Sequence, residues 1–225
     1  MDEGIAAAGL CRRFGRRWAL AGVDLVVPRG SSVMITGRNG SGKTTMLRCF
    51  ATALPPHMGG VRLLGQDPWL DIDNARRKVV LLSHATRMYE DLTASDNLLV
   101  WARLGGMDVD VVAALRDVGL EAARTEPVRS YSAGMRRRVA LAIALLKKPD
   151  VMLLDEPFAA LDPGGRAMMG RVISTLRARG ATLAIATHLP QVAGQYCDMA
   201  AHLADGKIAW TGAPADAPAE AEEVW

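Results

Sequence analysis

A glycine-rich segment carries the most specific chemical pattern in the sequence. Residues 37–44 read Gly-Arg-Asn-Gly-Ser-Gly-Lys-Thr and match the pattern G-x-x-x-x-G-K-[ST] at every fixed position. Glycines let the backbone curl so that successive N–H groups point inward, and the start of the following helix adds positive partial charge. We therefore expect this loop to bind the phosphates of a nucleoside triphosphate, through Gly37, Arg38, Asn39, Gly40, Ser41, Gly42, Lys43, Thr44 and Thr45.

Two side chains of this loop have individual tasks. Lys43 would bring an ammonium group to the outer phosphates, and Thr44 would offer its hydroxyl to Mg²⁺. An apolar run precedes the loop and a helical pattern follows it, which is the context that such a loop requires.

Two adjacent acidic residues follow a second apolar run. Val151–Leu154 is predicted as a buried strand, and Asp155 and Glu156 come directly after it. Because successive strand residues point to opposite faces, the two carboxylates can take different tasks. We expect Asp155 to hold Mg²⁺ and Glu156 to polarise the water that attacks the γ-phosphate of the bound nucleotide. A polar strand end is the simpler explanation, but the phosphate loop in the same chain favours the functional one.

A third segment, residues 131–138, is called the signature segment below. It precedes a helical pattern in which Val139, Ala142, Ile143 and Leu146 share one face. A serine cap at Ser132 and a glycine at the helix start would form an anion-binding end.

The order of the apolar runs predicts an α/β fold. Buried strands are expected at 32–36, 79–82, 151–154 and 183–186, and helices at 43–53, in most of 92–146, and at 163–179. Strands separated by helices favour a parallel sheet that is covered on both faces. Residues 5–27 instead predict short antiparallel strands, with breaks at Gly15 and Gly22.

Composition excludes several classes of protein. The 225 residues are 50% hydrophobic and 23% charged, which is globular and neither disordered nor fibrous. The longest apolar run, 139–146, is far shorter than the roughly 20 residues that span a bilayer. The acidic start is unlike a signal peptide, so a cytoplasmic chain is expected. The net charge is only +3 and the basic groups are scattered, so no nucleic-acid partner is expected.

Taken together, these segments resemble the ATP-binding subunit of ABC transporters over residues 5–212. Phosphate loop, signature segment, acidic strand, Ala160-Leu161-Asp162 and Thr187-His188 occur in the order of that family. The resemblance implies a P-loop NTPase with a RecA-like, mostly parallel core, an N-terminal antiparallel β subdomain and an inserted α-helical signature subdomain. We expect one domain at 1–212, with core and β subdomain from 1–83 and 149–212, a helical subdomain at 84–148, and a flexible acidic tail at 213–225.

The resemblance also implies partners and roles. Two copies, or one copy and a second ATPase, would sandwich two ATP molecules with Mg²⁺. The dimer would bind integral-membrane permease subunits at the inner face of the cell membrane and power their transport. His188 would join Lys43 and Glu156 in catalysis, by contacting the γ-phosphate or the attacking water. Phe14 would stack on adenine, with Trp18 as a rival. Four residues would act on the nucleotide of the other copy: Ser132, Gly134, Met135 and Asp162.

The sequence departs from the family at two places. The usual signature reads Leu-Ser-Gly-Gly-Gln, and Ala133 and Met135 replace a glycine and the glutamine. His84 stands where the family places a glutamine near Mg²⁺. Imidazole is a poor ligand for Mg²⁺, so His84 would instead bond a water or a phosphate, or simply cap a strand.

With these departures, the chain resembles the ATPase of the cytochrome c maturation system, which is often called a haem exporter. Export ATPases for drugs or lipids share much of the same pattern. A third hypothesis is a nucleotide-gated clamp that assembles or releases a membrane protein complex. Docking to the membrane subunit would fall on Arg87, Met88, Tyr89 and Trp101, although Trp101 also fits core packing.

Overall fold

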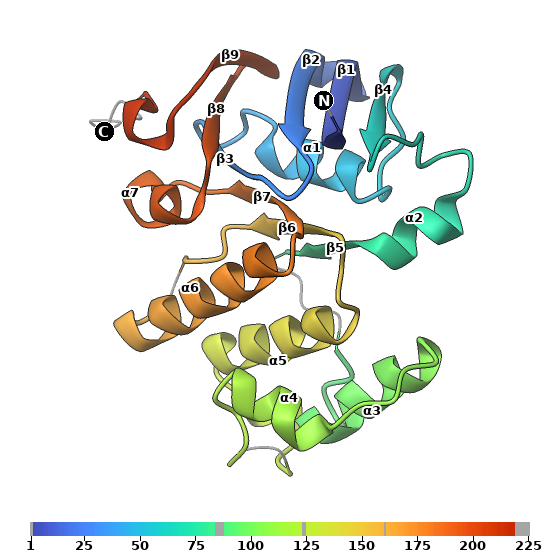
Figure 1. Cartoon of the computed structure of the whole chain (residues 1–225), viewed down its shortest axis with the longest axis vertical. Coiled ribbons are helices and arrows are strands. Elements are labelled where there is room, and N and C mark those ends of the chain that lie inside the picture. The colour runs from blue at the N-terminus through green and yellow to red at the C-terminus, as the bar shows by residue number, and fades with distance from the viewer. Residues whose placement is uncertain (1, 84–87, 123–124, 160, 219–225) are drawn as a thin grey trace.

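The computed structural model describes residues 2–83, 88–122, 125–159 and 161–218. Within these ranges the strands form two sheets that lie one above the other (Figure 1). The small antiparallel sheet has the order β2-β1-β4, with β1 at Glu3–Phe14, β2 at Arg17–Pro28 and β4 at Met58–Leu63. The large sheet has the order β5-β6-β7-β3-β8-β9, with β5 at Val79–Leu82, β6 at Val151–Asp155, β7 at Thr182–Ala186, β3 at Ser32–Thr36, β8 at Met199–Ala204 and β9 at Lys207–Gly212.

The large sheet confirms the predicted parallel core. All its neighbouring strands are parallel except β9, which pairs antiparallel with β8 at the edge. Every residue of β3, β6 and β7 is buried, because helices and the small sheet cover both faces. Ala186 pairs with Ile35 on one side and with Asp155 on the other, so the carboxyl ends of these three strands meet at one edge.

The small sheet differs from the prediction in one respect. Gly15 lies in the turn between β1 and β2, as expected, but Gly22 lies inside β2 with φ of 92°. The pairing slips at this point, where Leu10 faces Val23 and the next residue already faces Ala21. Gly22 therefore occupies a β-bulge, which adds a residue to a strand without ending it.

Side chains cap the N-termini of several helices. Side chains of Asp71, Thr93, Asp110, Ser132 and Asp162 each accept a hydrogen bond from a backbone N–H in the first turn of the helix that follows. The bounds are α1 Lys43–Phe50, α2 Ile72–Lys78, α3 Ala94–Leu104, α4 Val111–Asp117, α5 Ala133–Leu146, α6 Pro163–Ala178 and α7 Pro190–Ala193, with short 3₁₀ helices η1 Val128–Ser130, η2 Gly194–Tyr196 and η3 Pro214–Asp216.

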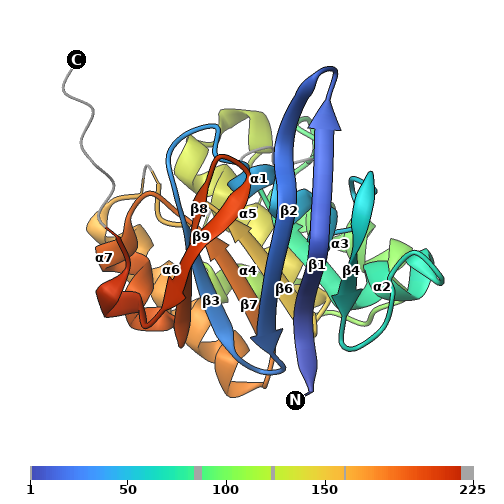
Figure 2. The same cartoon turned by 90° about the horizontal axis from the view of Figure 1, so that it is seen from above.

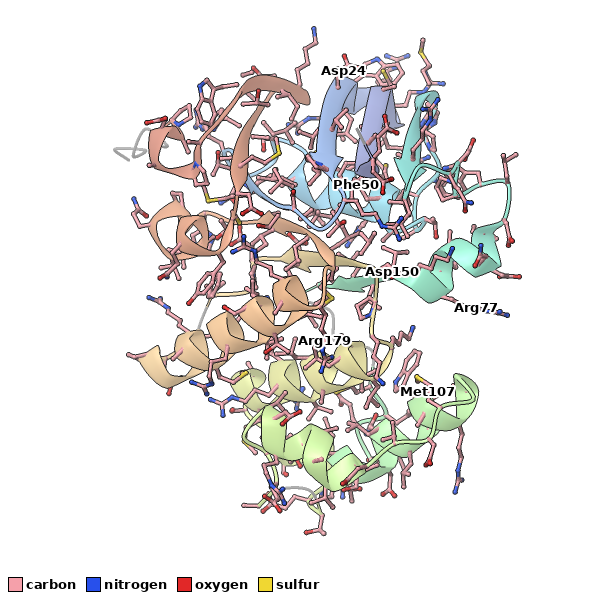
Figure 3. All side chains as sticks on the ribbon, viewed as in Figure 1. Asp24, Phe50, Arg77, Met107, Asp150 and Arg179 are labelled. Atoms are coloured by element: carbon pink, nitrogen blue, oxygen red, sulfur yellow. The ribbon has the colours of Figure 1, made fainter. Side chains whose placement is uncertain are left out.

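Two apolar clusters hold the layers together. In the first, α1 lies between the small and the large sheet and carries Phe50 (Figure 3). Met46, Leu47 and Phe50 of this helix are fully buried. In the second, α5 and α6 cover the other face of the large sheet, and α3 and α4 pack onto α5 at the lower end of Figure 1. Seen from above, β9 lies beside the long strand β2 (Figure 2), and the Ala21 N–H of β2 donates to the carbonyl of Gly206, in the turn between β8 and β9, at 2.8 Å.

The predicted subdomain boundaries stay a prediction. His84 and Arg87 lie outside the described residues, as do Ala160 and the chain from 219 on. In the predicted tail, residues 214–216 form η3. Of the helices that the structure describes, none combines the length and the apolarity that crossing a membrane requires.

We expect Leu98 of α3 to be one of the residues on which the stability of the helical layer depends. Its side chain is fully buried in the second cluster, whereas the neighbouring Leu99 is 39% exposed. Leu98→Ala should lower the free energy of unfolding by about 2–5 kcal/mol, because it leaves a cavity. Leu99→Ala should change it by about 0.5 kcal/mol or less. Urea unfolding of both variants measures the difference, and equal effects would contradict this packing.

Candidate nucleotide-binding site

The phosphate loop connects the end of β3 to the start of α1. Its glycines Gly37, Gly40 and Gly42 have φ of 139°, 80° and 113°, in the region that favours glycine. A Cβ at Gly37 would lie 2.2 Å from the carbonyl oxygen of Leu203, and one at Gly42 would lie 2.4 Å from that of Ala19. Two positions of the motif are thus glycine because the backbones of β8 and β2 press against the loop.

Lys43 opens α1 with an ammonium group that is almost enclosed. The residue is 8% exposed, and Nζ donates to the carbonyl oxygens of Gly37 and, at 3.1 Å, Arg38. Carbonyl oxygens carry only partial charge, so the full positive charge still favours an anion beside it.

A cavity of about 280 Å³ joins the loop to the acidic pair. Its described lining consists of Ala19, Arg38, Asn39, Gly40, Gly42, Lys43, Thr44, Thr45, Asp155 and Glu156. The cavity offers backbone N–H groups and one ammonium on one side and two carboxylates on the other. Such an arrangement can bind a phosphate chain together with a divalent cation.

Thr44 and Asp155 meet inside this cavity. The Thr44 hydroxyl donates to Oδ2 of Asp155 at 2.9 Å and lies 3.2 Å from Oδ1. Asp155 is 4% exposed. A carboxylate and a hydroxyl are hard oxygen donors of the kind that Mg²⁺ prefers, so this pair fits the expected metal.

Glu156 lies beyond the end of β6. Its φ of 51° is left-handed, a conformation that costs a residue other than glycine about 1–3 kcal/mol. Its N–H donates to the carbonyl of Ala186 at 2.9 Å. The expectation that strand alternation separates the carboxylates of Asp155 and Glu156 was therefore wrong, because the chain leaves the strand between them and the turn sets the direction of Glu156.

His188 lies next to this carboxylate, after the end of β7. Its Nδ1 lies 2.8 Å from Oε2 of Glu156, and its backbone N–H donates to the same oxygen at 3.2 Å. The structure thus brings Lys43, Thr44, Asp155, Glu156 and His188 to one edge of the large sheet.

The signature residues are arranged differently. Ser132 is exposed, and its hydroxyl caps α5 by accepting from the N–H of Met135 at 3.2 Å. Asp162 is exposed and caps α6 by accepting from the N–H of Gly165 at 2.7 Å. Gly134 and Met135 are half-buried in the first turn of α5. None of these residues belongs to the described lining of the cavity.

The adenine position stays open between two aromatic residues. Phe14 is 49% exposed and Trp18 43% exposed, at the same end of the small sheet. The Arg12 guanidinium lies 5.3 Å above the Phe14 ring, and that of Arg13 lies 5.8 Å from the Trp18 ring. Neither contact distinguishes the two rings as a surface for a base.

Sequence reasoning missed Arg137, which lies on α5 directly against the acidic pair. Its Nη2 donates to the backbone carbonyl oxygens of Asp155, at 2.9 Å, and Glu156. Burial lowers the pKa of the Arg137 guanidinium from its ordinary value, while the charges of Asp155 and Glu156 act in the opposite direction. No pattern marks this residue in the sequence, where it is one of three consecutive arginines.

Residues 20–159 match the family described as ABC transporter. The chain belongs to the ABC transporter family. Members of this family bind and hydrolyse ATP, so the cavity lies in an ATP-binding cassette.

Individual relatives extend this result over almost the whole cassette. The chain is 35% identical over 208 residues to the Nod factor export ATP-binding protein I of Burkholderia lata, covering 90% of this chain and 68% of that protein. It is 34% identical over 224 residues to the daunorubicin resistance ATP-binding protein DrrA3 of Streptomyces coeruleorubidus, covering 97% and 71%. A solved dimeric ATP-binding cassette in a post-hydrolysis state, bound to ADP and Pi, superposes with a TM-score of 0.84 at 25% identity, covering 93% of this chain and 98% of the other.

Gly42→Ala tests the packing of the phosphate loop. The new methyl group would meet the Ala19 carbonyl in a left-handed backbone, so the free energy of unfolding should fall by about 1–3 kcal/mol. ATP affinity should fall with it, because the loop must move. Gly60→Ala is the matched control, since its added Cβ would have no heavy atom of the described residues within 4 Å beyond its chain neighbours. Chemical unfolding and ATP titration of both variants check this; an unaffected Gly42→Ala would show that the loop is not confined.

Proposed function

We propose that this cassette hydrolyses ATP as a dimer and powers export through separate membrane subunits. The observation that carries the proposal is the shared cavity of the phosphate loop and the acidic pair, with the Thr44 hydroxyl 2.9 Å from Asp155. Catalysis by this arrangement is mainly positioning and neutralisation of charge.

Each side chain has a task in this proposal. The loop N–H groups and Lys43 hold the β- and γ-phosphates. Thr44 and Asp155 would hold Mg²⁺, which would supply positive charge to neutralise the phosphates. Glu156 accepts a hydrogen bond from the attacking water and polarises it. His188 keeps the Glu156 carboxylate in place and lies where it can reach the γ-phosphate or the water.

A second copy would complete the site. Ser132 and Asp162 cap helices on exposed surface outside the cavity, and we infer that they act with Gly134 and Met135 on the nucleotide of the partner. The dimeric state of the solved cassette supports this inference. The partner is a second copy of this chain or another ATPase of the family.

The membrane partner would dock on the helical layer, so that the cassette lies at the inner face of the cell membrane. A groove of about 540 Å³ runs between the sheet and α5, and Met88 and Trp101 line it. Tyr89, also expected at the docking site, is 54% exposed. The Lys147 ammonium lies 5.3 Å from the Trp101 ring at the rim of this groove.

The solute is proposed from the relatives. One is named for export of Nod factor and the other for resistance to daunorubicin, which supports export of a drug or a lipid-like molecule. Haem export in cytochrome c maturation stays a prediction that nothing here supports further. His84, one of the residues that suggested it, lies outside the described residues.

Glu156→Gln should separate hydrolysis from binding. Glutamine keeps the shape of the side chain but cannot act as a base, so kcat should fall by about 10²-fold or more. ATP affinity should stay within about threefold of wild type, because the phosphate loop is unchanged. A phosphate-release assay and titration with a fluorescent ATP analogue measure the two quantities.

Lys43→Ala is the contrasting variant for this experiment. It removes the ammonium from the phosphate side of the cavity and should abolish measurable ATP binding. Wild-type turnover in Glu156→Gln would disprove the role of Glu156, and retained affinity in Lys43→Ala would disprove the role of the loop.

Reconstitution with the membrane subunits distinguishes transport from the clamp. If the cassette powers export, the subunits should raise ATPase activity, and ATP should drive accumulation of solute in inside-out vesicles. The Glu156→Gln cassette should abolish that accumulation. Release of a protein complex on ATP addition, with no movement of solute, would instead support the clamp.

A further inference from the structure

Arg137 connects two functional segments of the same chain. It lies one turn into α5, the helix that begins at Ala133 and is capped by Ser132 of the signature segment. Its Nη2 donates to the carbonyl oxygens of Asp155 and Glu156, the two residues with the catalytic carboxylates. One guanidinium thus joins the signature helix to the backbone of the acidic pair.

The guanidinium of Arg137 is buried, and its charge must be compensated by neighbouring groups. Arg137 is 9% exposed, and a buried charge destabilises a protein unless its surroundings compensate it. Here the compensation comes from the two carbonyl oxygens and from the nearby carboxylates of Asp155 and Glu156. The Nε of Arg137 has no hydrogen-bond partner among the described residues. The contacts of Nη2 with the two carbonyl oxygens are therefore the ones that orient the guanidinium.

Arg137 holds the carbonyl group of Glu156, the residue whose backbone is strained. Glu156 has a left-handed φ of 51°, and its N–H is fixed by the carbonyl of Ala186 in β7. Arg137 fixes its carbonyl from α5, and the N–H of Ala159 also approaches that oxygen, at 3.3 Å. The direction of the Glu156 carboxylate therefore depends on a turn that is held from β7 on one side and from α5 on the other.

We propose that Arg137 is a positioning residue for hydrolysis, which ties the Glu156 turn to the signature end of α5. This proposal rests on the proposed function, in which the signature contacts the nucleotide of the partner. Ser132 and Arg137 are separated by about 7.5 Å along a helix that rises about 1.5 Å per residue. A shift of α5 when the signature binds that nucleotide would move Arg137, and with it the turn that carries Glu156 of the same chain.

Arg137→Gln tests the proposal, with Arg137→Lys as the conservative variant. Glutamine is too short to reach both carbonyls, so kcat should fall by about tenfold to a hundredfold, as expected for a catalytic group that is misplaced by about 1 Å. KM and ATP affinity should stay within about twofold, because the phosphate loop is untouched. Lysine restores a positive charge without the planar fork and should recover part of kcat.

Arg138→Gln is the matched control, since Arg138 is not among the signature residues proposed to contact the nucleotide of the partner. It makes the same change in the next residue of α5, and no hydrogen bond joins Arg138 to the acidic pair among the described residues. Its kcat should stay within about twofold of wild type. A wild-type kcat in Arg137→Gln, an equal loss in Arg138→Gln, or a loss of affinity that matches the loss of kcat would each overturn the proposal.

Hydrogen exchange supplies a readout that needs no turnover. The backbone amides of Glu156, Phe158 and Ala159 should exchange at least about tenfold faster in Arg137→Lys than in wild type, with an unchanged midpoint of urea unfolding. Unchanged exchange would overturn the proposal even if the glutamine variant does not fold. If wild type showed no ATPase activity at all, the proposed function would fail. Faster exchange in Arg137→Lys would still show that Arg137 holds the Glu156 turn.

Discussion

The confinement of the phosphate loop between two sheets is the constraint on which the site depends. Gly37 passes the backbone of β8 and Gly42 passes that of β2 so closely that neither position has room for a Cβ. The small sheet therefore fixes where α1 begins, and α1 in turn places Lys43 and Thr44. Because Thr44 bonds to Asp155 at the end of β6, the two halves of the cavity are located relative to each other before any ligand enters.

The acidic pair shows that one strand can serve two different requirements. Asp155, the proposed Mg²⁺ ligand, is the last residue of β6 and is almost fully buried, which would fix the position of its carboxylate. Glu156 leaves the sheet through a strained turn, and contacts from β7 and α5 hold it there. The strain disfavours the folded state locally, and the surrounding contacts compensate it so that the carboxylate faces the cavity.

The features that could be predicted are those set by residues close together in the sequence. The phosphate loop, the buried strands and the cap at Ser132 are local, and the structure contains each of them. Helix α2 was missed because none of its residues is buried, so it has no apolar period to detect. The predicted cap at Ser132 sets the start of helix α5 at Ala133, whereas the apolar face from Val139 alone does not, because the first turns of the helix are polar.

The contacts that place Glu156 could not be predicted for a different reason. Its left-handed turn and its bond to Ala186 depend on how β6 lies against β7, and its contact with Arg137 depends on how α5 crosses the sheet. In the sequence, Arg137 is indistinguishable from Arg136 and Arg138. In the structure, Arg136 pairs with Glu90 near the surface, while Arg137 is buried against the backbone of Asp155 and Glu156. Helical rotation of about 100° per residue separates the two arginines, and the packing of α5 on the sheet decides which of them reaches the site.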